Sequence, residues 1–206
     1  MFAPTPHDVW DKYLDVYGLE GVFPVAKTDI GNLACIASEE ILYPEIARCL
    51  AVRGAEVFLH ASSEVGSPML TQKNIAKQAR AIENMAYLVS ANSAGIADIA
   101  IPFASTDGSS KIINYEGLQL CEANTGESMV ANATIDISAL RHHRQRPSMS
   151  NFLARQRFVL YADTYANTTL YPANTLLDKK ADRSHFVLTQ KKVIENLTNL
   201  GIICPP

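Results

Sequence analysis

The sequence predicts an α/β layered domain, and three observations indicate it. The chain has 206 residues, of which 48% are hydrophobic and 19% charged, so it is long and apolar enough for one sizeable core. Strand and helix patterns alternate from about residue 22 to residue 137. The order β-α-β-α-β then passes into a β-rich run, which is typical of helices layered on a sheet.

The first strand, turn and helix occupy the start of this alternation. Residues 22–28 form a short apolar run, and Gly31 opens the buried-strand pattern NLACIAS, which ends at Ser38. Pro44 suits the first turn of a helix, and Gly54 suits its C-terminal cap. We therefore expect a strand that runs into a helix through a short turn at Ser38.

The same alternation is then repeated. Residues 55–61 predict a strand, and the Ser-, Gly- and Pro-rich residues 62–70 predict a loop. Thr71 can cap a helix, and residues 87–91 are again strand-like. The apolar face of that helix is predicted, at helical spacing, to consist of Ile75, Ala79, Ile82 and Ala86.

A β-rich region follows. Residues 111–115 and 118–121 flank Glu116-Gly117, a pair that indicates a hairpin turn. Residues 129–137 form a further strand-like run. These strands are expected to extend the sheet built by the preceding alternation.

The character of the chain changes after this region. We expect residues 1–146 to form the folded domain and residues 147–206 to form an arm that contacts an oligomer partner, with periodicity mainly at 186–200. Arginines gather at the junction, which indicates a solvated helix face or an oligomer contact. Without interleaved aromatic residues this run does not favour nucleic-acid binding. The arginines are Arg141, Arg144, Arg146, Arg155 and Arg157.

Composition and the cysteines narrow the function classes. The net charge is −3, and no apolar stretch reaches the roughly 18 residues of a membrane span. The N-terminal residues lack a signal-peptide pattern, so a cytoplasmic protein is expected. Cys35, Cys49, Cys121 and Cys204 fit no metal-binding spacing, and we predict neither a metal nor a cofactor. Cys35 and Cys49 lie in apolar runs and are expected to be buried thiols.

The stretch from residue 31 to residue 64 carries the strongest functional signal. It reads as a strand, a sharp turn, a helix and a second strand, with Ser38 at the turn. A nucleophile at such a turn is exposed at the sheet edge beside backbone N–H groups that can bind an oxyanion. Ser38 is therefore a candidate nucleophile, and the backbone N–H of Glu39 is a candidate oxyanion donor.

A series of short motifs, in order and at matching spacing, resembles the carbon–nitrogen hydrolase (nitrilase) superfamily over about residues 20–146. The motifs are Tyr43-Pro44-Glu45, Arg48, Gly54-Ala55-Glu56, Arg80-Ala81-Ile82-Glu83-Asn84, Ser90-Ala91-Asn92, Ser105-Thr106-Asp107-Gly108, Ser110-Lys111-Ile112 and Glu116-Gly117. The resemblance implies an α-β-β-α sandwich, of which this chain contains the C-terminal half and lacks the N-terminal part. It also implies hydrolysis of a non-peptide C–N bond by a Glu–Lys–Cys set.

This chain departs from the family pattern in two respects. In the family the nucleophilic cysteine stands five residues before the tyrosine of the Tyr-Pro-Glu motif, and that position here is Ser38 rather than Cys35. The family's Glu and Lys lie upstream of the region that this chain contains. Ser38 is accordingly a vestigial or structural serine, a working nucleophile with help from a partner or from an alternative start of the chain, or an engineered replacement of Cys. His60, on the next strand, is the nearby candidate base or a pocket histidine.

The remaining candidate residues have two interpretations each. Glu40 is a pocket wall or a surface charge, and Ser62, Ser63 and Glu64 line a substrate pocket or are ordinary loop residues. Glu45 and Arg48 are expected to form an intrahelical pair or to brace the turn. Arg80 and Glu83 are expected to brace their helix against the sheet.

Three function hypotheses follow from the resemblance. The chain hydrolyses a small amide or nitrile, or it is a non-catalytic nitrilase-fold subunit or scaffold, or it is a truncated form of a longer amidase or nitrilase. Half of a sandwich exposes a sheet face or edge, which favours association. We therefore expect a homodimer or larger homo-oligomer, or pairing with a separately encoded N-terminal half.

Overall fold

The computed structural model describes residues 5–67, 70–106, 108–123 and 128–204. The chain forms two compact units: a sheet unit of residues 23–156, and a terminal unit in which residues 1–22 join residues 157–206. Among the described residues, no helix has both the length and the apolar character that crossing a bilayer requires.

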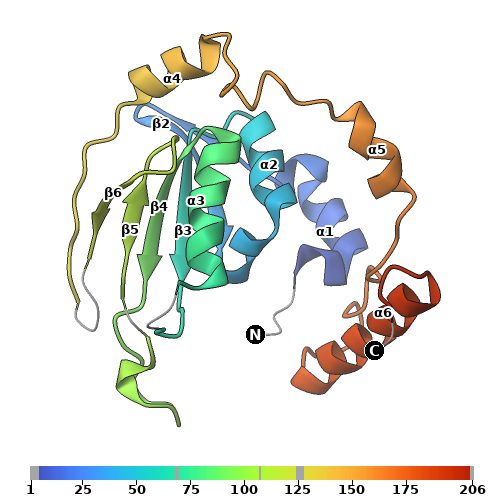
Figure 1. Ribbon diagram of the computed structural model, residues 1–206. Coiled ribbons are helices and arrows are strands. Elements are labelled where there is room, and N and C mark those ends of the chain that lie inside the picture. The colour runs from blue at the N-terminus through green and yellow to red at the C-terminus, as the bar shows by residue number, and fades with distance from the viewer. Residues whose placement is uncertain (1–4, 68–69, 107, 124–127, 205–206) are drawn as a thin grey trace. The chain divides into compact units, whose positions relative to one another are not determined.

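The sheet unit contains one six-stranded sheet whose strands follow one another in chain order (Figure 1). The strands are β1 (Ala26–Thr28), β2 (Gly31–Ala37), β3 (Val57–Ser62), β4 (Tyr87–Asn92), β5 (Lys111–Ile113) and β6 (Gln119–Glu122). Strands β2, β3 and β4 are parallel, whereas β1, β5 and β6 pair antiparallel with their neighbours. Because parallel strands need crossover connections, a helix follows β2 and another follows β3. The alternation predicted from the sequence is confirmed.

The two crossover helices, α2 (Pro44–Val52) and α3 (Gln72–Asn84), cover one face of the sheet (Figure 1). Alternate strand residues point toward them and form the main core. Ala34, Ile36, Phe58 and Leu88 of the strands pack in one cluster with Leu50 of α2 and with small residues of both helices. The helices approach closely because those residues are alanines.

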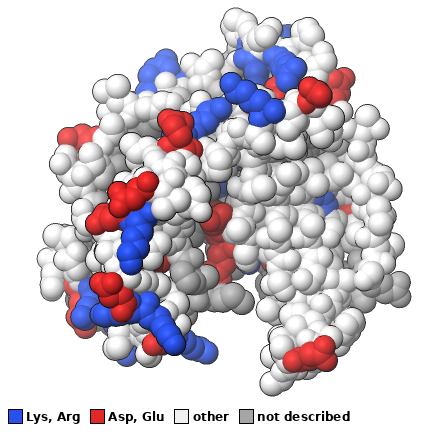
Figure 2. All heavy atoms as spheres, turned by 180° about the vertical axis from the view of Figure 1, so that it is seen from behind, with Lys and Arg blue, Asp and Glu red and all other residues white. Residues whose placement is uncertain are grey.

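The other face of the sheet is largely uncovered. Its exposed residues, which we call the open sheet face, are Cys35, Ala37, Leu59, Ala61 and Ala91. They are the intervening residues of β2, β3 and β4, so the pleat turns them away from α2 and α3. Figure 2 shows the molecule from behind, and a broad area of that side carries few charged side chains. The expectation that Cys35 is a buried thiol is wrong, because it lies on this face and is exposed.

Helix α4 (Ile137–Gln145) packs at one end of the same side of the sheet. Leu140 is fully buried against Val57 and Tyr87 in a second, smaller core cluster. The hydroxyl of Tyr87 also accepts a hydrogen bond from the backbone N–H of Asp136 at 3.1 Å. These contacts fix the point at which the chain turns into α4.

The strand expected at residues 129–137 is wrong. Residues 128–136 have no regular secondary structure, and α4 begins at Ile137 because Asp136 caps it: Oδ1 accepts the N–H of Ala139 at 2.8 Å. Residues 129–131 instead line a cavity of about 210 Å³ together with residues of β4, β5 and β6.

Two arginines of α4 bind the sheet unit: Arg141, whose side chain remains 54% exposed, and the half-buried Arg144. Arg141 pairs with Glu56 through two nitrogens, at 2.6 and 2.9 Å. These hydrogen bonds, more than any other influence, lower the pKa of the Glu56 carboxyl. Arg144 donates to the carbonyl oxygens of Ala55 and Met85 at 2.7 and 2.9 Å. The loops that precede β3 and β4 are thereby tied to α4.

The buried face of α3 differs from the one predicted. Ile75 and Ile82 are 52% and 37% exposed, whereas Lys77 is only 1% exposed and Arg80 only 8%. The helix is rotated so that polar side chains enter the interior, and each of them finds a partner there, as described below. The expected apolar face is therefore wrong at both isoleucines.

The terminal unit is built from α1 (Trp10–Tyr17), α5 (Val159–Ala166), α6 (Arg183–Asn199) and their connections. The carboxylate of Asp8, buried to 3% exposure, accepts the hydroxyl of Thr175 at 2.6 Å. The N–H of Asp11 donates to the side-chain oxygen of Asn174 at 2.9 Å. The N-terminal segment thus bonds to a segment more than 160 positions away in the sequence.

Candidate functional site

The site is built around the turn at the end of β2. Ser38 follows the last strand residue, Ala37, and opens the 3₁₀ turn Ser38–Leu42 with φ of +43°. This is the left-handed region, which a residue with a Cβ adopts at a cost of about 1 kcal/mol or more. Such strain is a feature of turns that expose a nucleophile between a strand and a helix. Ser38 lies at the carboxyl end of a parallel strand, as predicted from the sequence.

Glu40 stabilises this turn. Its Oε2 accepts the backbone N–H of Ala37 at 2.7 Å, so the carboxylate closes the turn back onto the end of β2. Glu39 lies between Ser38 and Glu40 in the same turn and is half-buried. The carboxylate of Glu40 therefore shapes the backbone around Ser38.

His60 also contacts this turn. Its Nε2 lies 3.0 Å from the carbonyl oxygen of Ser38, and its Nδ1 lies 2.9 Å from the hydroxyl of Ser90. A carbonyl oxygen only accepts, so Nε2 carries the proton and Nδ1 accepts from Ser90. Burial lowers the pKa of His60, which keeps the ring neutral in this arrangement. Both ring nitrogens are thus engaged away from the Ser38 hydroxyl.

Lys73 reaches the Ser38 hydroxyl from the first turn of α3. Its Nζ donates to Oγ of Ser38 at 3.3 Å. The start of α3 is fixed by Thr71, whose Oγ1 accepts the N–H of Asn74 at 3.2 Å. Lys73 is half-buried, so the ammonium is partly withdrawn from solvent beside the hydroxyl.

One turn further along α3, Lys77 forms a buried ion pair with Glu64. Nζ and Oε1 are 2.8 Å apart, and the side chains are 1% and 8% exposed. Burial acts to raise the pKa of Glu64, but the hydrogen bond and charge of Lys77 outweigh it and hold that pKa below its usual value. The N–H of Glu64 donates to Oδ1 of Asn92 at 2.7 Å. The loop after β3 is thereby tied to α3 and to β4.

Arg80 ties α3 to the turn itself. Its Nε donates to the carbonyl oxygen of Ile41 at 3.0 Å, and its guanidinium pairs with Glu83. Asn84 donates to the carbonyl oxygen of Arg80 at 2.9 Å. Ile41 is fully buried under this contact. The position of Lys73 relative to Ser38 is therefore held by several bonds between α3 and the turn.

The structure brings some of the sequence candidates together and leaves others apart. Glu64 lies close to Lys77 and Lys73, and Lys73 in turn contacts Ser38. Ser62 is half-buried at the end of β3. Ser63 and Glu45 are exposed, and Arg48 is half-buried on α2. Pro68 and Met69 of the predicted loop, and Asp107 of the predicted hairpin motif, lie outside the described residues.

The two lysines of this site were missed in the sequence. Lys73 and Lys77 stand four residues apart after the N-cap Thr71, so both lie on one face of α3. That spacing was available as a signal. The isoleucines at positions 75 and 82 obscured it, because they suggested a different buried face.

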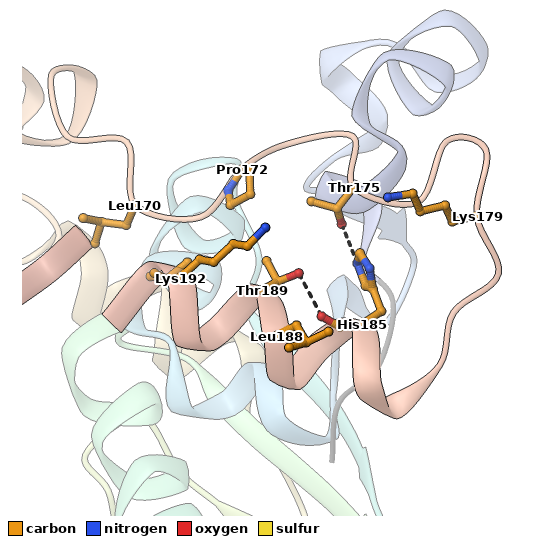
Figure 3. Close-up of a pocket in the computed structure, with 9 residues that line it drawn as sticks. Leu170, Pro172, Thr175, Lys179, His185, Leu188, Thr189 and Lys192 are labelled. Carbon is orange, nitrogen blue, oxygen red and sulfur yellow. Dashed lines mark hydrogen bonds between the residues drawn. The ribbon is translucent and has the colours of Figure 1, made fainter. Parts of the chain in front are cut away.

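A second hollow lies within the terminal unit (Figure 3). It has a volume of about 410 Å³ and includes Lys179, Lys192 and the pair His185–Thr175, whose Nε2 and Oγ1 are 3.2 Å apart. The residues that line it include no serine or cysteine. Its lining therefore offers no counterpart to the nucleophile turn of the sheet unit.

Comparison with known proteins extends this picture. The pattern of the family described as carbon-nitrogen hydrolase matches residues 3–145. A probable nitrilase of Schizosaccharomyces pombe is 30% identical over 115 residues, which are 56% of this chain and 40% of that protein. The chain therefore spans less than half the length of this curated relative.

Solved structures show the same fold. A carbon-nitrogen hydrolase of Helicobacter pylori G27 superposes with a TM-score of 0.57 at 24% identity, over 69% of this chain and 52% of that one. An amidase of Nesterenkonia sp. AN1, with acrylamide added at its active-site cysteine, gives 0.54 at 23% identity, over 69% and 48%. A cysteine-to-alanine variant of the same amidase, in complex with butyramide, gives 0.50 at 21% identity, over 68% and 47%. The solved structures share the fold, and the family pattern covers more than half of the sequence: this chain belongs to the carbon-nitrogen hydrolase family.

Proposed function

We propose that the chain is the nucleophile-bearing half of a hydrolase that cleaves the C–N bond of a small amide or nitrile, with Ser38 as the nucleophile. The observation that carries this proposal is the left-handed backbone of Ser38 at the end of a parallel strand. Left-handed backbone also occurs elsewhere in the chain, at Ser109 for example, but at Ser38 it coincides with a strand-to-helix turn of the kind that presents a nucleophile.

The chemistry at Ser38 is acyl transfer. Oγ forms a bond to the amide carbon, the C–N bond breaks, and the nitrogen leaves as ammonia or an amine after taking up a proton. Water then displaces Ser38 from the acyl group and releases the acid. The N–H of Glu39, next in the turn, is the proposed donor to the oxyanion, and Ser62, Ser63 and Glu64 are the proposed pocket wall.

The test uses ammonia release from short aliphatic amides and nitriles, with butyramide among them because the related amidase binds it. The native chain, Ser38→Ala and Ser38→Cys are compared. We expect Ser38→Ala to be inactive and Ser38→Cys to exceed the native chain, because a thiolate is intrinsically the better nucleophile. If neither the native chain nor Ser38→Cys releases ammonia, the chain is not a self-sufficient hydrolase.

A second candidate is a non-catalytic subunit of the same fold. The replacement of cysteine by serine favours it, because the related amidase carries its chemistry on a cysteine. A serine hydroxyl needs a well-placed base at neutral pH, whereas a cysteine is already partly ionised. Activity in the native chain that disappears in Ser38→Ala excludes this alternative.

The proposal includes association through the open sheet face, with a second copy of the chain as the partner. Leu59 lies at the centre of this face with 36% of its surface exposed, and its neighbours Cys35, Ala37, Ala61 and Ala91 are exposed and uncharged. Two identical apolar faces complement each other about a twofold axis, and stacked sheets pack about 10 Å apart. Covering them removes apolar surface from water.

Native mass spectrometry of Leu59→Glu tests this association. We expect the native chain to be dimeric and Leu59→Glu monomeric, because a buried unpaired carboxylate is costly. Ile75→Glu is the matched control, since Ile75 is 52% exposed on α3, which packs on the opposite face of the sheet. Dissociation by Ile75→Glu alone locates the contact on the helices. A monomeric native chain that becomes dimeric only with an N-terminal nitrilase half identifies that half as the partner.

A further inference from the structure

We propose that Lys73 is the proton acceptor for Ser38, so that this chain contains a Ser–Lys pair of its own. The inference rests on the proposed role of Ser38 as the nucleophile and adds the residue that activates it. Serine needs such a partner, since its hydroxyl is essentially never ionised at neutral pH. Lysine serves as the base of serine in some hydrolases of other folds.

The contact between the two side chains is the first support. Nζ of Lys73 lies 3.3 Å from Oγ of Ser38, within reach of proton transfer. The two residues are 35 positions apart, so the contact depends on the packing of α3 against the turn. That packing is fixed on both sides of Lys73 by the Thr71 cap and by the bond from Arg80 to the carbonyl oxygen of Ile41.

The engagement of the neighbouring titratable groups is the second support. His60 donates through Nε2 to the Ser38 carbonyl oxygen and accepts at Nδ1 from Ser90. The carboxylate of Glu40 accepts from the N–H of Ala37, and Glu64 is paired with Lys77. Lys73, by contrast, donates a hydrogen bond directly to the Ser38 hydroxyl.

The first step balances once Lys73 has released one proton to solvent. Its neutral amine then takes the hydroxyl proton while Oγ forms its bond to the carbonyl carbon. The resulting ammonium then returns a proton to the leaving nitrogen as the C–N bond breaks. In the second half of the reaction Lys73 accepts a proton from the attacking water and gives it back to Ser38.

Other titratable groups lie near Lys73. Lys77, one turn along α3, forms an ion pair with Glu64 of the loop after β3, so their charges offset each other. His60, on β3, is kept neutral by burial, which lowers its pKa.

A fluorophosphonate probe tests the pair without requiring amide turnover. Oγ of Ser38 forms a bond to phosphorus, the P–F bond breaks, fluoride leaves, and Lys73 takes the hydroxyl proton. Intact-protein mass spectrometry follows the adduct over time. The compared proteins are the native chain, Ser38→Ala, Lys73→Gln, Lys73→Arg and the control Lys27→Gln, which removes an exposed lysine of β1.

We expect adduct in the native chain and in Lys27→Gln, none in Ser38→Ala, and labelling about 100-fold slower in both Lys73 variants. Lys73→Arg is decisive, because arginine keeps the positive charge but cannot accept a proton. Circular dichroism and thermal unfolding should be the same for all five proteins, because Lys73 is only half-buried.

Two outcomes overturn the inference. Labelling of Lys73→Arg at the native rate shows that the positive charge alone is enough, and absence of labelling at Ser38 in the folded native chain shows that the hydroxyl is not activated. The proposed hydrolysis fails separately: Lys73-dependent labelling without release of ammonia supports the pair and contradicts the activity. Amide hydrolysis that requires Ser38 but tolerates Lys73→Arg supports the proposed activity and contradicts the Ser–Lys pair.

Discussion

Lys77 and Glu64 form an ion pair of 2.8 Å in which both side chains are almost completely removed from solvent. Lys77 lies on α3 and Glu64 in the loop that follows β3, so the pair joins the helix to the edge of the sheet that carries Ser38. A buried pair of this kind is sensitive to the loss of one partner, because the charge left behind has neither water nor a counterion.

Lys77→Met should therefore lower the free energy of unfolding by about 3–5 kcal/mol. Urea denaturation measures the change, with Lys27→Met as the control because that lysine is exposed. The double variant Lys77→Met/Glu64→Leu should recover most of the loss, since no unpaired charge remains. A single variant within about 1 kcal/mol of the native chain contradicts the buried pair.

Stability should fall as the pH is lowered from 7 toward 5, because of His60. Burial lowers its pKa in the folded chain, so the unfolded chain binds the proton more readily. The stabilisation is therefore complete above the unfolded value of about 6.5 and is lost as the pH falls toward the folded pKa. The slope cannot exceed about 1.4 kcal/mol per pH unit for one group. Urea unfolding of His60→Gln across this range should give a smaller slope than the native chain.

Arg144→Ala should destabilise the sheet unit by about 1–3 kcal/mol, because the carbonyl oxygens of Ala55 and Met85 lose their donor. Arg146→Ala is the matched control, since Arg146 is exposed just after the same helix. Thermal unfolding compares the two variants. Equal loss in both indicates that the charge of the arginine run matters and that these hydrogen bonds do not.

Ser38→Gly and Ser38→Ala should separate strain from chemistry. Both remove the hydroxyl and with it the fluorophosphonate adduct, but glycine adopts φ of +43° without strain, whereas alanine, like serine, adopts it at a cost. Ser38→Gly should therefore be more stable than Ser38→Ala by about 1 kcal/mol. Equal melting temperatures contradict a strained turn at this position.

Much of the fold could be predicted from the sequence because local patterns determine it. The buried-strand pattern before Ser38, the proline and glycine that bound α2, and the hairpin signal at Glu116-Gly117 all correspond to observed elements. The start of α4 also had a local signal, the cap Asp136, but the apolar run before it indicated a strand. A capping residue can thus be a better guide than a short apolar run.

The contacts of the site could not be predicted, because they join distant segments. Lys73 meets Ser38 across 35 positions, and Arg80 meets Ile41 across 39. The periodicity of α3 favoured burial of Ile75, yet Lys77 is buried instead because Glu64 supplies its counterion. Burial of a charged residue depends on such a partner, which helical spacing does not reveal.

The open sheet face around Leu59 affects how the chain behaves in solution. If its cover comes from another molecule, the folded form gains stability by mass action, and the melting temperature rises with protein concentration. The chain emerging from the ribosome then reaches its most stable form only by a bimolecular step. Its yield should therefore depend on how soon two partners meet, and co-expression with a covering partner should limit aggregation.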